Sequence, residues 1–153
     1  MIRVLSLLIF NLSVKMEGDH STVDESSNMT RRAVENGTRS ISDYQLVRII
    51  GTGTFGKVYL AILNGKGFAL KMLHKKKIIE LKQIDHIKNE KNILAGVQHP
   101  FIVNLVEAFQ DKLNLYLVFD FVQGGEIFRL LRKENIFPND VALFYIAEIT
   151  LAL

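Results

Sequence analysis

A glycine-rich stretch between two apolar runs places the strongest constraint on the fold of this chain. Residues 51–58 read GTGTFGKV. They fit three phosphate-binding patterns at once: G-x-G-x-x-G, which opens a helix in dinucleotide-binding folds; G-x-x-x-x-G-K, which opens a helix in P-loop proteins; and G-x-G-x-x-G-x-V, which joins two strands. Because the three patterns need different elements after the glycines, the flanking residues decide between them.

The flanking residues predict strands on both sides of the glycines. Leu46 to Ile50 and Val58 to Leu63 are apolar, β-branched runs of the kind that forms strands. Asn64-Gly65 is a strong signal for a two-residue hairpin turn, and residues 68–73 predict a third strand after it. The glycines therefore join two strands and do not open a helix.

The two alternatives also lack their characteristic side chains. A dinucleotide-binding fold needs an acidic residue about 20 positions after the glycines, where this sequence has Lys76. A P-loop needs Ser or Thr directly after Lys57 to hold Mg²⁺, but the side chain of Val58 has no oxygen. The remaining pattern is the one in which a strand pair covers a nucleotide with backbone N–H groups.

Downstream of this region the apolar periodicity changes from strand to helix and back. Apolar-stripe positions recur three or four residues apart from Gln83 to Val97, which predicts a helix that ends at His99-Pro100. Two further strands are predicted at residues 102–109 and 115–122, and two helices at residues 126–134 and 139–153. These elements define an α+β fold class.

Two charged residues occupy positions that an apolar core would normally exclude. Lys71 lies in the third strand, on the same face as Ala69. Glu90 lies within the apolar stripe of the predicted helix, between Ile87 and Leu94. Burying a charge is costly unless the charge is paired, and an ion pair between Lys71 and Glu90 accounts for both positions. The alternative for Glu90 is the edge of the stripe, where its carboxylate reaches water.

Several of these stretches resemble one protein family. FALK at residues 68–71 is similar to the V-A-I-K strand of protein kinases. KIIELKQIDHIKNEKNIL (77–94) and LNLYLVFDFVQGGEIF (113–128) resemble AGC-group serine/threonine protein kinases, in particular the cAMP-dependent subfamily. The resemblance implies a protein-kinase-like fold over residues 43–153. The N-lobe, about residues 43–122, would be a five-stranded antiparallel sheet with a regulatory helix, and the hinge with the first C-lobe helices would occupy about residues 120–153.

The resemblance implies that this region binds ATP together with Mg²⁺. The implied nucleotide-binding residues are Ile50, Gly51, Thr52, Gly53, Thr54, Phe55, Gly56, Lys57, Val58, Ala69, Lys71, Phe119, Asp120, Val122 and Glu126. In this family the glycine-rich backbone around Thr54 would cover the phosphates, and Lys71 would reach the α- and β-phosphates. The Asp120 carbonyl and the Val122 amide would hydrogen-bond adenine, and Phe119 would be the gatekeeper that closes the pocket behind it.

The same resemblance assigns roles outside the phosphate and base contacts. Glu126 would bind ribose and help to recognise a substrate arginine. Leu94 and Leu105 would belong to the regulatory spine of stacked side chains, and Ile127 to the catalytic spine. His86 lies on the helix where relatives contact the activation-loop phosphate, although an ordinary surface histidine is an equal alternative on sequence grounds.

The residues that perform phosphoryl transfer are not found in this sequence. Kinases position the substrate hydroxyl and Mg²⁺ with the H-R-D-x-x-x-x-N and D-F-G motifs, and neither motif occurs here. No catalytic residue and no metal ligand is therefore assigned, and the catalytic aspartate is expected beyond Leu153. Residues 141–153 are apolar at 11 of 13 positions, which predicts a helix made to be buried. We expect a kinase domain with a truncated C-lobe that is inactive alone; the alternative is a non-catalytic product that binds nucleotide or a partner.

The first 42 residues differ from the rest in composition. Residues 1–15 are apolar, and resemble either a secretory signal or sequence ahead of a mis-assigned start at Met16. The apolar run is too short for a membrane span, and the absence of a clear cleavage site disfavours secretion. Residues 17–42 are polar and predict a disordered tail. We expect a cytoplasmic protein, with the nucleus as the alternative.

Composition and resemblance together limit the partners. The chain has no cysteine, so thiolate-based metal or redox sites are excluded. Its net charge of +3 is too small to argue for nucleic-acid binding. The resemblance implies protein substrates with basic Ser/Thr sites and a cAMP-binding regulatory subunit.

Overall fold

The computed structural model describes residues 39–153, so the apolar segment 1–15 and most of the polar tail lie outside the described residues. In chain order the elements are η1 (Ile41–Asp43), β1 (Gln45–Thr52), β2 (Gly56–Leu63), β3 (Lys66–His74), α2 (Lys75–Glu80), α3 (Ile84–Gly96), β4 (Leu105–Gln110), β5 (Asn114–Asp120), α4 (Ile127–Glu134) and α5 (Asn139–Ala152). The five strands form one antiparallel sheet in the order β1-β2-β3-β5-β4. This is the predicted α+β architecture.

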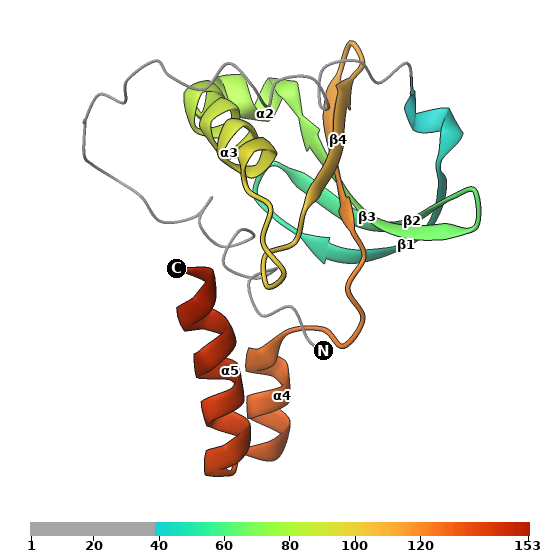
Figure 1. The fold of residues 1–153 in the computed structure, drawn as a ribbon. Helices are drawn as coiled ribbons and strands as arrows, with labels where there is room; N and C mark the ends of the chain where they lie inside the picture. The colour runs from blue at the N-terminus through green and yellow to red at the C-terminus, as the bar shows by residue number, and fades with distance from the viewer. Residues whose placement is uncertain (1–38) are drawn as a thin grey trace.

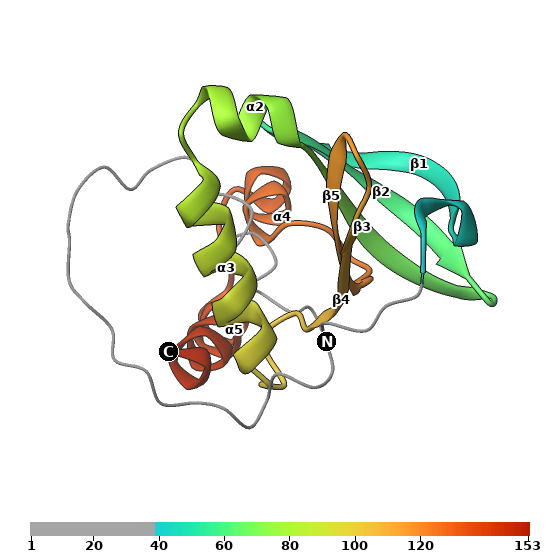
Figure 2. The ribbon, with the colours of Figure 1, turned by 90° about the horizontal axis from the view of Figure 1, so that it is seen from above.

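The helices lie in two separate places relative to the sheet. Figures 1 and 2 show α2 and α3 beside one face of the sheet, whereas α4 and α5 form a pair below it, joined by the segment that follows β5. Among residues 39–153, no helix is long and apolar enough to cross a membrane.

The hairpin between β2 and β3 follows directly from its turn residues. Asn64 has φ 50° and Gly65 has φ 77°, which is the left-handed conformation that a two-residue hairpin turn requires and that Asn-Gly adopts readily. β2 and β3 then pair without interruption from Leu63↔Lys66 to Gly56↔Leu73. The predicted hairpin is confirmed, and it sets the register of the central strands.

Apolar side chains fill both faces of the sheet. On one face, sheet residues such as Leu73 and Leu117 pack against Ile87 and Leu94 of α3. The opposite face holds a second cluster around Leu70, which also contains the aromatic residues Tyr44, Phe68, Phe109 and Tyr116. Because strand side chains alternate, Lys71 projects from the face that α3 covers.

Two strand boundaries differ from the prediction. β4 begins at Leu105, not at Ile102, because the Ile102 amide donates to the His99 carbonyl (3.2 Å) in a turn beside Pro100. β5 ends at Asp120, two residues before the predicted end. The basic run after β3 also forms its own helix, α2, which ends at Glu80; Lys82, two residues later, has φ 53°. Tertiary hydrogen bonds and one left-handed residue thus set boundaries that periodicity does not show.

Residues 39–42 belong to the folded domain, although the sequence analysis assigned them to the disordered tail. Asp43 caps η1 by accepting a hydrogen bond from the Ser40 amide at 2.7 Å. Arg39 Nη1 donates to both carboxylate oxygens of the buried Glu107 at 3.3 Å, and the Tyr44 hydroxyl donates to the same carboxylate. Burial and the Glu107 carboxylate raise the pKa of Tyr44 above its usual value. These contacts tie the segment before β1 to the opposite edge strand, β4.

The turn between β4 and β5 is organised by Asp111. Its carboxylate accepts hydrogen bonds from the Tyr116 hydroxyl (2.7 Å) and from the amides of Leu113 (2.7 Å) and Asn114 (2.6 Å). The Tyr116 hydroxyl, and then the two amides, lower the pKa of Asp111 from 3.8 to about 2, because each donor favours the charged form. Folding therefore favours ionised Asp111.

Asp111→Asn is expected to lower the melting temperature near pH 7, and the deficit should shrink in acid. A carboxyl whose pKa is depressed by folding stabilises the protein above its unfolded pKa and loses that contribution as the pH falls through its folded pKa. For Asp111 this interval runs from 3.8 down to about 2. Thermal melts of both proteins between pH 7 and pH 2 check this, and a deficit that stays constant over the whole range would contradict it.

Candidate nucleotide-binding site

The glycine-rich stretch forms a tight turn at the end of the first hairpin. The Gly53 amide donates to the Gly56 carbonyl at 2.9 Å, which closes the turn between β1 and β2. The β1–β2 register shifts between Ile49 and Gly51, so Ile50 is the extra residue of a bulge. Thr52, Gly53, Thr54 and Lys57 are exposed along this turn. A bulge bends and twists its strand, and here it does so at the start of the turn.

Predicted base-contacting residues lie on one face of the sheet. Val58 pairs with Lys71, and Ala69 pairs with Phe119, so in each antiparallel pair the two side chains share a face. Because Ala69 and Lys71 are two positions apart in β3, both pairs project from the same side. Ala69 is also partly buried against the cluster that contains Phe119. The structure therefore brings four of the predicted site residues together.

The ion pair expected between Lys71 and Glu90 is present. Lys71 Nζ lies 2.8 Å from Glu90 Oε1, and the two side chains are 11% and 17% exposed. α3 presents Glu90 to the sheet because Ile87 and Leu94, on the same helix stripe, are buried against it. A charge-assisted contact at this depth fixes both side chains, so Lys71 Nζ has a defined position on the α3 side of the sheet.

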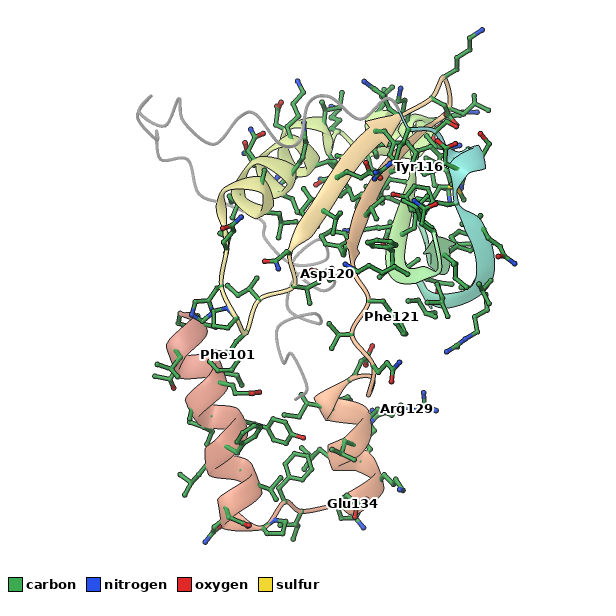
Figure 3. The ribbon with its side chains drawn as sticks, turned by 45° about the vertical axis from the view of Figure 1, so that its right-hand side comes forward. Phe101, Tyr116, Asp120, Phe121, Arg129 and Glu134 are labelled. Carbon is green, nitrogen blue, oxygen red and sulfur yellow. The ribbon has the colours of Figure 1, made fainter. Side chains whose placement is uncertain are left out.

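The segment after β5 carries the remaining predicted contacts. Val122 is partly buried against the same cluster as Ala69, whereas Glu126 is exposed at the N-cap of α4. Gly124 (φ 111°) and Gly125 (φ 77°) have left-handed conformations between them, which allow the chain to turn sharply from the sheet into α4. Figure 3 shows this segment running from Asp120 past Phe121 to α4.

The residues predicted to form spines are only partly brought together. Leu94 of α3 and Leu105 of β4 are both buried in the cluster against α3. Ile127 lies in α4 and is not a member of that cluster. His86 is exposed on α3, which fits either of its two interpretations.

Sequence reasoning missed the side chain of Phe55. It was predicted to contribute its backbone only, but the residue is only 7% exposed and packs in one cluster with Leu73, Ile78 and Ile87. The Phe55 carbonyl also accepts a hydrogen bond from the His74 amide at 2.9 Å. The signal was an aromatic residue in an otherwise small and polar turn. Phe55 thus anchors the glycine turn to the β3–α2 junction.

These features define the class of protein. The protein kinase domain family matches residues 44–153, which is most of the described region, and the chain belongs to this family. It is an AGC-type sequence, and similar proteins are cAMP-dependent protein kinases. It is 51% identical over 121 residues to the cAMP-dependent protein kinase catalytic subunit of Dictyostelium discoideum. The aligned region covers 77% of this chain and 18% of that protein.

Two fungal cAMP-dependent protein kinases are also similar to this chain. The cAMP-dependent protein kinase type 3 of Saccharomyces cerevisiae is 48% identical over 120 residues, covering 77% of this chain and 30% of that protein. The cAMP-dependent protein kinase catalytic subunit of Schizosaccharomyces pombe is 43% identical over 154 residues, covering 99% of this chain and 28% of that protein. The chain spans less than a third of the length of these relatives.

Proposed function

We propose that this chain is the ATP-binding part of a serine/threonine protein kinase of the cAMP-dependent type. The observation that carries the proposal is the Lys71–Glu90 pair at 2.8 Å, on the sheet face that also carries Val58, Ala69 and Phe119. A fixed ammonium group beside a small apolar surface suits a triphosphate joined to a flat base. The names of the relatives add protein phosphorylation under cAMP control to this proposal.

Each group of residues has a separate task in this proposal. Lys71 binds the phosphates, and Glu90 orients Lys71. The turn from Gly53 to Gly56 covers the phosphates with backbone N–H groups, while Val58 and Ala69 enclose the base. The Asp120 carbonyl and the Val122 amide fix the orientation of the base. When bound, ATP supplies the γ-phosphoryl group that a protein kinase transfers to a Ser or Thr hydroxyl.

Transfer itself needs groups beyond these. An aspartate must position the substrate hydroxyl, and Asp and Asn side chains must hold Mg²⁺. Because the sequence has neither H-R-D-x-x-x-x-N nor D-F-G, the residues present fit the nucleotide but not its metal. We therefore assign nucleotide binding to this chain. Transfer to basic Ser/Thr sites, the cAMP-binding regulatory subunit and the cytoplasmic location are proposed for the whole kinase.

The test is nucleotide binding by the 153-residue chain. A fluorescent ATP analogue should bind saturably, and Lys71→Met should weaken binding by about tenfold or more, the effect of losing roughly 1.4 kcal/mol of charge interaction. Lys76→Met is the matched control, because Lys76 is an exposed lysine on α2 that forms a surface pair with Glu80. Circular dichroism checks that each variant is folded.

A second assay separates binding from transfer. The chain should not move ³²P from ATP to a basic serine peptide. Peptide labelling that Lys71→Met abolishes would show that the chain is itself a complete transferase. Unaltered binding of the analogue by Lys71→Met would remove the basis for the proposed site.

A further inference from the structure

The carboxylate of Asp120, at the end of β5, is held from two sides. Lys66 Nζ lies 3.3 Å from Asp120 Oδ1, and Asn104 Nδ2 lies 3.4 Å from Asp120 Oδ2. The backbone adds a third contact, because the Asp120 amide donates to the Asn104 carbonyl at 3.3 Å. Lys66 begins β3, and Asn104 directly precedes β4. Three segments distant in sequence therefore meet at the last residue before the segment that leads to α4 (Figure 3).

This cluster lies on the sheet face opposite the nucleotide-binding residues. Asp120 pairs with Phe68, and Val118, two residues earlier in β5, is buried in the cluster around Leu70. Phe119 and Lys71 project from the other face. Since strand side chains alternate, the Asp120 carboxylate points away from the proposed nucleotide. It can influence the nucleotide only through its own backbone.

The contacts that Lys66 and Asn104 make with the carboxylate differ in strength. The Lys66 side chain is 66% exposed, and exposed pairs contribute little on their own, although Lys66 Nζ also lies 5.0 Å from the centre of the Phe68 ring. Asn104 is more constrained. Within residues 39–153 its Oδ1 is buried without a hydrogen-bond partner. Rotating the side-chain amide by half a turn would place Oδ1, an acceptor, against the Asp120 carboxylate. Donation to Asp120 therefore determines the amide orientation.

We infer that Asp120 is a positioning residue, anchored by Asn104 and Lys66, that fixes the end of β5 and so aims its own carbonyl and the Val122 amide at a purine base. The neighbouring backbone needs such an anchor, because Gly124 and Gly125 follow within five residues in left-handed conformations. The anchor marks where the rigid sheet ends and the hinge begins. The part of this inference that concerns the base rests on the proposed ATP site.

The first test needs no nucleotide. Asn104→Asp places two carboxylates against each other. It should speed hydrogen exchange of the backbone amide of residue 120, which donates to the Asn104 carbonyl, by about tenfold, the effect expected when a charged hydrogen bond is lost. Amides in the middle of β3 and β5 should keep their rates. The double variant Asn104→Asp/Asp120→Asn restores a carboxylate–amide pair with the roles exchanged, and it should return exchange to within about threefold of the original rate.

Two further variants keep this test decisive. Asn104→Ala removes the side-chain donor without adding charge, and it replaces Asn104→Asp if that variant does not fold. It should also speed exchange of the Asp120 amide. Lys133→Met, which removes an exposed pair with Glu134 in α4, is the matched control and should change nothing there. Original exchange rates in Asn104→Ala, or no recovery in the double variant, would overturn the inference.

The second test asks whether the anchor acts on the base. ATP is compared with purine riboside triphosphate, which lacks the 6-amino group that would donate a hydrogen bond to the Asp120 carbonyl. Asn104→Ala should weaken ATP binding by about threefold to tenfold, as expected for misdirected hydrogen bonds. It should weaken the analogue less, because the analogue can lose only the contact to the Val122 amide. Lys71→Met should weaken both nucleotides to the same extent. Equal weakening of both nucleotides by Asn104→Ala would mean a general structural role and refute positioning. If the unaltered chain binds neither nucleotide, the proposed function fails. The hydrogen-exchange rates then still show whether Asn104 and Lys66 anchor Asp120.

Discussion

Gly56→Ala is expected to destabilise the chain by roughly 3 kcal/mol, the upper range for overpacking a site that cannot relax. A Cβ on Gly56 would lie 1.8 Å from the Met72 carbonyl oxygen and 2.9 Å from the Met72 carbonyl carbon. Both atoms are backbone atoms of β3, which is paired with β2 on one side and β5 on the other. The obstruction cannot be relieved by rotating a side chain, so the beginning of β2 would have to move away from β3.

Urea unfolding of the two proteins measures this effect, with Gly96→Ala as the matched control. A Cβ at Gly96 meets nothing within 4 Å, and Gly96 ends α3. Alanine there should be neutral or stabilising by up to about 1 kcal/mol, because glycine is the poorer helix former. If Gly56→Ala unfolds at the same urea concentration as the original chain, the β2–β3 packing described above is wrong. The close approach of the β3 backbone thus requires glycine at position 56 independently of phosphate binding.

Lys71→Met and Glu90→Leu, made singly, are each expected to cost about 3 kcal/mol of unfolding free energy, the lower range for removing one partner of a buried ion pair. The side chains are only 11% and 17% exposed, so the remaining charge keeps its burial and loses the opposite charge that this pair supplies. The double variant Lys71→Met/Glu90→Leu should recover most of the loss, because well-packed apolar residues often replace a buried pair at little cost.

Four proteins complete this cycle: the original chain, the two single variants and the double variant. Unfolding free energies from urea titrations should show a favourable coupling between the two substitutions of about 3 kcal/mol or more, at the upper end of the range for residues in contact. Additive losses would contradict the contact between Lys71 and Glu90. The double variant should still bind the ATP analogue poorly. Recovered stability without recovered binding would separate the functional use of Lys71 from its structural one.

Much of the sheet and its central ion pair could be predicted from sequence, because the signals there are local and chemical. Asn64-Gly65 specifies a turn, β-branched runs specify the strands on either side, and two costly charges require each other. The position of the glycines between strands then excluded the two helix-opening alternatives. None of these inferences needed to know which distant segments touch.

Features that depend on distant contacts were missed. From sequence Arg39 was assigned to a polar tail, but in the structure it contacts Glu107 of β4. Phe55 reads as a loop residue until α2 and α3 supply the pocket that buries it. Asp120 reads as the polar end of a strand, and its anchors lie 54 and 16 positions away along the chain. In each case the partner is set by the order of strands in the sheet, which apolar periodicity does not encode.

The strand order β1-β2-β3-β5-β4 also bears on how the molecule folds. β1, β2 and β3 are neighbours in both sequence and space, so their pairing closes only short loops and can form rapidly. Joining β3 to β5 is slower, because paired residues such as His74 and Asn114 are 40 positions apart and the intervening chain must be ordered at an entropic cost. Lys71 comes from the early part and Phe119 from the late part. The two halves of the site therefore meet only when the second hairpin docks, and nucleotide-binding competence should be the last property to appear during folding.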